Sequence, residues 1–182
     1  MNGEASTKEK ILQAARKVFA EKGFLKASVE SIAREAEVSK SLVFWYFKNK
    51  DELIKEVVKD ILPGKAVEEC LSKNIKGEEL VRCFIERYVK LLSDPLNKKL
   101  AIHLMGLSLV HPNYKKLYDE FCEEALRELA RRLFCREPDE VDMATVRGLN
   151  GLVLCNSARG YDKVEVLASI AIPLLKERGL CT

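Results

Sequence analysis

The 182-residue chain lacks a hydrophobic run long enough to cross a membrane. Its longest nearly unbroken apolar stretch, residues 100–110, is interrupted by His103 and is about half of the roughly 20 residues that a spanning helix needs. Residues 1–9 are polar and of mixed charge, without the apolar stretch and small residues of a secretory signal. We therefore expect a cytoplasmic protein with no membrane partner.

Closely spaced metal ligands are also missing. The nearest of the six cysteines are 13 positions apart and there are only two histidines, so no zinc-binding spacing occurs. Glycine-rich phosphate loops, HExxH and GxSxG are absent as well. We expect no metal, no cofactor and no catalytic residue, against the alternative of an α-helical enzyme. Because the cysteines fall at helical apolar positions, we expect reduced, buried thiols, with redox sensing as the alternative.

Helical periodicity runs through almost the whole sequence, whereas strand-like alternation never lasts beyond a few residues. The chain contains 47% hydrophobic residues, enough for one or two packed cores, and we predict an all-α fold. Capping residues and Gly or Pro breaks mark the helix ends. Helices are expected from Ser6 to Gly23, from Ser28, from Ser39, from Asn49 to residue 62, and over 65–72, 78–93, 96–110, 112–135, 139–158 and 162–177.

Two of these helices are short and are joined by the three-residue turn Ala36-Glu37-Val38, which is the arrangement of a helix-turn-helix. The positions where the two helices must pack are apolar or small. Residues 1–50 also hold ten Lys and Arg against six Asp and Glu, whereas the remainder is nearly neutral. This local excess of positive charge favours a polyanionic partner.

Residues 28–53 and the helix before them resemble the signature of the TetR/AcrR family of transcriptional regulators. That signature has a small-residue cap, an IA pair, an A-G-V-S turn, and an aromatic run closing with YF-x-x-K-x-x-L. Two departures occur here. Glu37 replaces the turn glycine, so it must accept a left-handed backbone at about 1 kcal/mol or distort the turn, and Ser41 and Phe44 replace a glycine and a tyrosine of the recognition helix. The resemblance is specific over residues 7–55 and implies a helix-turn-helix DNA-binding domain at 1–48 and a helical effector-binding and dimerisation domain at 49–182.

The second helix of the motif is expected to enter the major groove. Val43 and Phe47 should face the core, whereas Trp45 is compatible with either side. Lys40 can donate to guanine, and Leu42 or Phe44 can contact a thymine methyl group. The remaining exposed hydroxyl and lysine side chains are suited to phosphates, although a solvated face is the plain alternative. The expected DNA contacts are Ser28, Ser39, Lys40, Ser41, Leu42, Phe44, Tyr46, Lys48 and Lys50.

The C-terminal part carries two further expectations. In the family, the last two helices pair across a two-fold axis as a four-helix bundle; the same faces could instead form only an intrachain core. The apolar residues 100–107, with His103 among them, could line a pocket for a small, largely apolar effector or be ordinary core. The expected dimer interface is Val141, Thr145, Gly148, Leu149, Leu152, Leu167, Ile170, Ala171 and Leu174, and the expected pocket is Phe84, Tyr88, His103, Met105, Tyr118 and Phe121.

Together these patterns predict a transcriptional regulator, a repressor that binds a pseudo-palindromic double-stranded DNA operator as a homodimer and is released by its effector. The alternative is a helical protein-interaction adaptor that has lost specific DNA binding.

Overall fold

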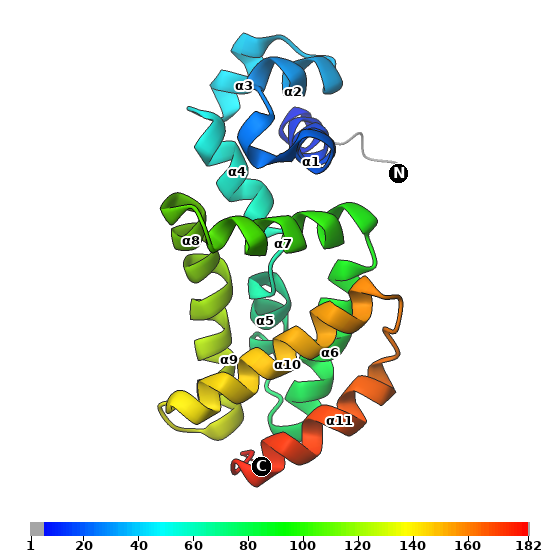
Figure 1. The fold of residues 1–182 in the computed structure, drawn as a ribbon, viewed down its shortest axis with the longest axis vertical. Helices are drawn as coiled ribbons and strands as arrows, with labels where there is room; N and C mark the ends of the chain where they lie inside the picture. The colour runs from blue at the N-terminus through cyan, green and yellow to red at the C-terminus, as the bar shows by residue number, and fades with distance from the viewer. Residues whose placement is uncertain (1–5, 182) are drawn as a thin grey trace.

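The computed structural model describes residues 6–181, and within that range every regular element is helical (Figure 1). The all-α prediction is therefore confirmed. The elements are α1 Thr7–Lys26, α2 Val29–Glu35, α3 Lys40–Tyr46, α4 Lys50–Lys59, α5 Gly64–Leu71, α6 Gly77–Leu92, α7 Pro95–Ser108, α8 Pro112–Tyr118, the π-helical turn η1 Asp119–Glu123, α9 Glu124–Phe134, α10 Glu140–Ala158 and α11 Val164–Glu177.

The N-terminal helix begins as its capping residue predicts and is broken at Gly23. The Ser6 side chain accepts a hydrogen bond from the Glu9 N–H at 3.2 Å. Gly23 has a φ of 80°, which a residue with a side chain rarely adopts, and the helical path bends there. A further helical turn follows the kink, and the element as a whole extends to Lys26. The predicted helix break at Gly23 is thus present, and one additional turn follows it.

Helix α4 connects the helix-turn-helix to the rest of the molecule (Figure 1). It is capped by Asn49, whose side chain accepts from the Glu52 N–H at 2.9 Å. Its apolar face, which includes Leu53 and Val57, is fully buried. Below it, α5 to α11 form a helical bundle, with α7 lying across the end that faces α1.

The contact between α1 and α7 depends on the missing side chain of Gly23. A Cβ at this position would lie 2.9 Å from His103 Cε1, closer than real Cβ contacts come. The His103 ring packs 5.4 Å from that of Phe24, and the Tyr114 ring lies 6.0 Å from the Phe24 ring. Phe24, in the last turn of α1, therefore packs the N-terminal domain against α7 and α8.

The predicted helix over 112–135 forms as a continuous helical segment that contains a π-helical turn. It forms α8, the wider turn η1, and α9. Gly64, at the start of α5, faces this turn so closely that a Cβ there would lie 2.9 Å from the Phe121 carbonyl oxygen. This close contact fixes the position of α5, and of α4 before it, relative to the rest of the bundle.

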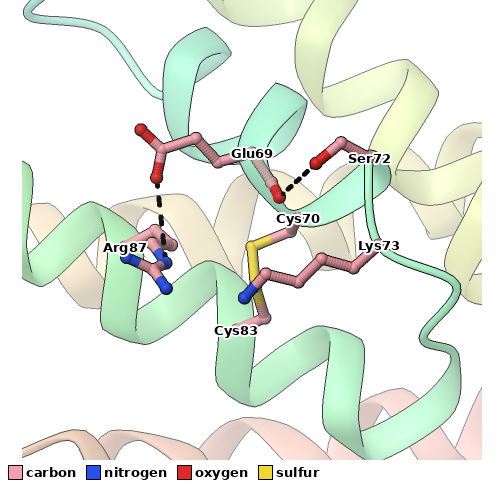
Figure 2. The surroundings of a disulfide bond; sticks show 6 residues. All are labelled: Glu69, Cys70, Ser72, Lys73, Cys83 and Arg87. Atoms are coloured by element: carbon pink, nitrogen blue, oxygen red, sulfur yellow. Dashed lines mark hydrogen bonds and ion pairs between the residues drawn. A yellow bond between two sulfur atoms is a disulfide. The ribbon is translucent and has the colours of Figure 1, made fainter.

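Four of the six cysteines are paired, so the expectation of reduced thiols was wrong for them. Cys70 in α5 and Cys83 in α6 form one disulfide with a Cα–Cα distance of 5.9 Å (Figure 2). The other joins Cys135, after α9, to Cys181 near the C-terminus. Periodicity places cysteines on buried faces but does not say which faces meet, and for this reason the pairs were missed.

The remaining thiols belong to Cys122, which is buried, and Cys155, which is exposed. Burial raises the pKa of the Cys122 thiol to about 12. It therefore stays protonated and unreactive at neutral pH.

Candidate nucleic-acid interface

The turn of the helix-turn-helix keeps its shape without the usual glycine. Glu37 has a φ of 55°, so it accepts the left-handed conformation, the first of the two outcomes that the sequence allowed. The Val38 N–H donates to the Ala33 carbonyl at 3.0 Å across the turn. The two helices after Ser28 and Ser39 are capped by those residues, whose hydroxyls accept from backbone N–H groups at 3.2 and 3.1 Å.

The recognition helix α3 has one buried face. Val43 and Phe47 are 1% and 2% exposed, as expected, and pack on the core that α1 and α2 build. Leu42 and Tyr46 are half-buried at the border of this face. The outer side of α3 is therefore supplied by the expected contacts Lys40, Ser41 and Phe44, together with Trp45.

Trp45 is the residue of this surface that the sequence-based set omitted. It is 75% exposed, the largest exposure of any aromatic side chain on α3, and its ring meets the Tyr46 ring edge-on at 4.6 Å. A sequence signal for this placement existed. Each helical residue turns by about 100°, so a residue midway between the inward-facing Val43 and Phe47 lies on the opposite side.

The lysines of the motif differ in how far they are already engaged. Lys40 forms an ion pair with Glu30 and lies 5.8 Å from the centre of the Phe44 ring. Its hydrogen bond lowers the pKa of the Glu30 carboxyl, which is therefore an anion beside the recognition helix. Lys50 Nζ donates to the Leu25 carbonyl at 3.0 Å. Lys48 is exposed and its side chain has no partner among residues 6–181.

The six residues expected to line an effector pocket occupy different surroundings. Phe84 and Tyr88 of α6 are buried with rings 5.7 Å apart, and burial raises the pKa of the Tyr88 hydroxyl, with Cys122 and Tyr118 beside it. His103 instead packs on Phe24, where the N-terminal domain contacts α7. Met105 and Phe121 lie near the surface. Met105 is 39% exposed, and the Phe121 ring lies under the Lys55 ammonium.

The expected dimer surface forms an apolar groove between α10 and α11. The groove has a volume of about 490 Å³. Val141, Ile170 and Leu174 along it are 54%, 48% and 55% exposed, which is unusual for aliphatic side chains. Leu167 does not line the groove and is buried in the core at 1% exposure. The other expected interface residues line the groove: Thr145, Gly148, Leu149, Leu152 and Ala171.

At one end of this groove a buried carboxylate fixes α11 to α10. Asp142 is fully buried and accepts hydrogen bonds from Arg178 Nε at 3.0 Å and from Arg136. Burial alone would raise the pKa of the Asp142 carboxyl, but these hydrogen bonds and that of the Asp139 N–H lower it below its ordinary value. The carboxylate is therefore ionised and holds both guanidinium groups in place.

Among residues 6–181, no helix combines the length and apolar character that spanning a membrane requires. Over the same range, no cluster of three or more His, Cys, Asp or Glu side chains is arranged to hold a metal ion.

A capped two-helix motif with an outward-facing second helix, seated on a helical bundle, places the chain in the class of helix-turn-helix proteins. Residues 11–57 match the family described as bacterial regulatory proteins, tetR family. The N-terminal helix-turn-helix domain of the chain is therefore similar to this family.

Relatives with the same motif are distant. The HTH-type transcriptional regulator HbdR of Aromatoleum sp. is 34% identical over 70 residues, which cover 38% of this chain and 30% of that protein. The probable HTH-type transcriptional regulator YttP of Bacillus subtilis is 38% identical over 61 residues, 34% of this chain and 30% of that protein. The chain thus spans less than a third of the length of these curated relatives.

The fold of the whole chain has counterparts among solved structures. Salmonella enterica GusR superposes with a TM-score of 0.67 at 21% identity, over 96% of both chains. A TetR-like transcriptional regulator from Rhodococcus sp. RHA1 has a TM-score of 0.65 at 19% identity over 98% of both. These likenesses extend the shared fold to the C-terminal bundle.

Proposed function

We propose that the chain is a DNA-binding transcriptional regulator. The observation that carries this proposal is the outer side of α3, where Lys40, Phe44 and Trp45 are exposed on a short helix that its neighbours leave free to enter a major groove. Ser28, Ser39, Lys48 and Lys50 flank it and suit phosphate contacts, with the capped helix N-termini adding N–H donors. On DNA, Lys40 exchanges its Glu30 partner for a base edge or a phosphate.

The regulator is proposed to act as a homodimer. One recognition helix of seven residues reads few base pairs, so specificity requires two copies on a pseudo-palindromic operator. The exposed aliphatic side chains of the α10–α11 groove support this proposal, because a second copy in a two-fold dimer would cover them. In this arrangement the domain of residues 1–48 binds DNA together with Lys50 just after it, and the domain of residues 49–182 dimerises and receives the effector.

Release by a small, largely apolar effector completes the proposal and makes the regulator a repressor that works in the cytoplasm. The interior supports such a site because two buried polar side chains of α10, Asn150 and Ser157, have oxygen atoms without hydrogen-bond partners among residues 6–181. The effect of a ligand that binds beside them can be transmitted to the DNA-binding domain through α4 and through the contact between Phe24 and His103. It acts by its differential affinity for the released state, about 1 to 3 kcal/mol.

The first experiment uses Trp45, the only tryptophan of the chain, as its own reporter. Duplex DNA from upstream of the gene is titrated into the protein at low salt while tryptophan emission is recorded. We expect a saturable change in emission, because the exposed indole becomes covered. Tight DNA binding without a change in emission would place Trp45 outside the interface, and absence of binding would favour the protein-interaction adaptor.

Lysine variants then test the phosphate contacts. Lys48→Met and Lys50→Met each should lower the slope of log affinity against log salt by about 1. Lys163→Met, before α11 on the bundle, is the matched control and should leave the slope unchanged.

A further inference from the structure

A polar cavity lies where the N-terminal domain meets the bundle. Its volume is about 280 Å³, and its wall takes Arg16 from α1, Glu69 from α5, Arg87 and Lys90 from α6, and Asn97 from α7. One water molecule takes up about 30 Å³, so the space exceeds what a single solvent molecule fills. It shares no lining residue with the α10–α11 groove.

The disulfide between α5 and α6 fixes two walls of this cavity. Glu69 directly precedes Cys70, and Arg87 lies one helical turn after Cys83 (Figure 2). The covalent link holds the two side chains opposite each other, with Arg87 Nε 3.7 Å from Glu69 Oε2. The cavity is therefore preorganised, which lowers the entropic cost of binding a ligand.

Two buried polar atoms on the wall have unmet hydrogen-bonding capacity. Arg87 Nε has no hydrogen-bond partner among the described residues, since its distance to Glu69 is too long for one. Asn97 is 7% exposed; its Nδ2 donates to the Leu91 carbonyl at 3.0 Å, but its Oδ1 is unpartnered within residues 6–181. The wall therefore offers one donor and one acceptor, each of which costs free energy while it stays unsatisfied.

The cavity wall also carries charged side chains of both signs. On the α1 and α6 side, Arg16 and Lys90 have no acidic partner within residues 6–181. On the α7 side, Asp94 lines the cavity and uses one carboxylate oxygen to accept from the Leu96 N–H at 2.8 Å, which leaves the other available. Asp60 and Lys65, which also line the cavity, pair with each other at 3.1 Å, so the wall combines these unpaired cations with carboxylate and amide oxygens that can accept hydrogen bonds.

We propose that this cavity binds a small zwitterion of the α-amino acid type. The carboxylate is held by Arg87 with Arg16 or Lys90, and the ammonium donates to Asn97 Oδ1 and Asp94. The volume lies just below the range of about 300–1,000 Å³ for ligand sites, which fits a molecule of this size. Because Arg16 belongs to the DNA-binding domain, the ligand bridges both domains; any effect on DNA affinity rests on the proposed function, but the binding itself does not.

The test is calorimetry on the full chain with its disulfides intact and without DNA. Each of the standard amino acids is titrated separately, and acetate and methylammonium serve as half-ligands. We expect one molecule per chain to bind with a dissociation constant below about 10 mM for at least one amino acid, and each half-ligand to bind at least about tenfold more weakly. Binding of none of them would overturn the proposal, and so would acetate that binds as tightly as the amino acid.

Variants locate the site. Arg87→Met and Asn97→Leu should each weaken binding by at least about tenfold, whereas Lys99→Met, at an exposed position on α7, should not change it. Melting temperatures of the ligand-free variants establish that they fold. Arg16→Met, which removes a second cation from the cavity wall, gives an independent reading if Asn97→Leu is unstable. Unchanged affinity in both arginine variants would overturn the site.

Discussion

Leu174 offers the most quantitative test of the proposed dimer. It is 55% exposed in the α10–α11 groove of the isolated chain. Complete burial of a leucine side chain contributes about 1.5–3 kcal/mol, so covering the exposed part contributes about 1–1.5 kcal/mol. In a two-fold interface the residue occurs twice, which gives about 2–3 kcal/mol, or about 30- to 150-fold in the dimer dissociation constant.

The assay is sedimentation equilibrium of the Leu174→Ala variant over a range of concentrations. Leu25→Ala is the matched control, because Leu25 is 52% exposed but lies at the end of α1, away from the groove. We expect the dissociation constant to rise for the first variant only, with both melting like the parent at concentrations where they are monomeric. Equal dissociation constants for the two variants would refute the assignment of the groove as the dimer interface.

Three further predictions concern DNA affinity and stability. Trp45→Ala should weaken operator binding by about 2 kcal/mol, or about 30-fold, at an unchanged melting temperature, as measured by anisotropy of labelled DNA; unchanged affinity would contradict the role of the indole. Asp142→Asn should lower the free energy of unfolding in urea by about 3 kcal/mol at pH 7, because Arg178 loses its buried partner. Since the pKa of Asp142 is lowered from 3.8, this difference is complete above pH about 4 and should close as the pH falls through the lowered value; a constant difference down to pH 2 would argue against an ionised carboxylate. Replacing both Cys70 and Cys83 by Ala should lower the free energy of unfolding by about 3 kcal/mol for a separation of 13 residues, and equal stability in oxidised and reduced parent protein would show that the bond contributes nothing.

Local features could be predicted from the sequence because they depend on residues close together in the chain. Ser6, Ser28, Ser39 and Asn49 cap the helices expected to follow them. The left-handed conformation of Glu37 follows equally from the geometry of a three-residue turn. The helix-turn-helix and its buried face could therefore be predicted from the order of residues alone.

Features that join distant segments could not be predicted in this way. The bend at Gly23 is matched to His103, 80 positions later, whose ring would have to shift to admit a Cβ there. Periodicity marked Cys70 and Cys83 as buried but did not place α5 against α6. That His103 packs on Phe24 and not beside Phe84 could not be predicted either, because the pattern of an apolar helix does not indicate which helices surround it.

The central claim is sequence-specific DNA recognition by two copies of the chain. It is tested most directly by fluorescence anisotropy of the full chain on DNA from upstream of its gene and on scrambled DNA of the same length, at about 50 to 200 mM salt. We expect two chains per upstream fragment and an affinity at least about a thousandfold above that for the scrambled DNA. Equal, steeply salt-dependent binding to both DNAs, or no binding at the lowest salt, would contradict it.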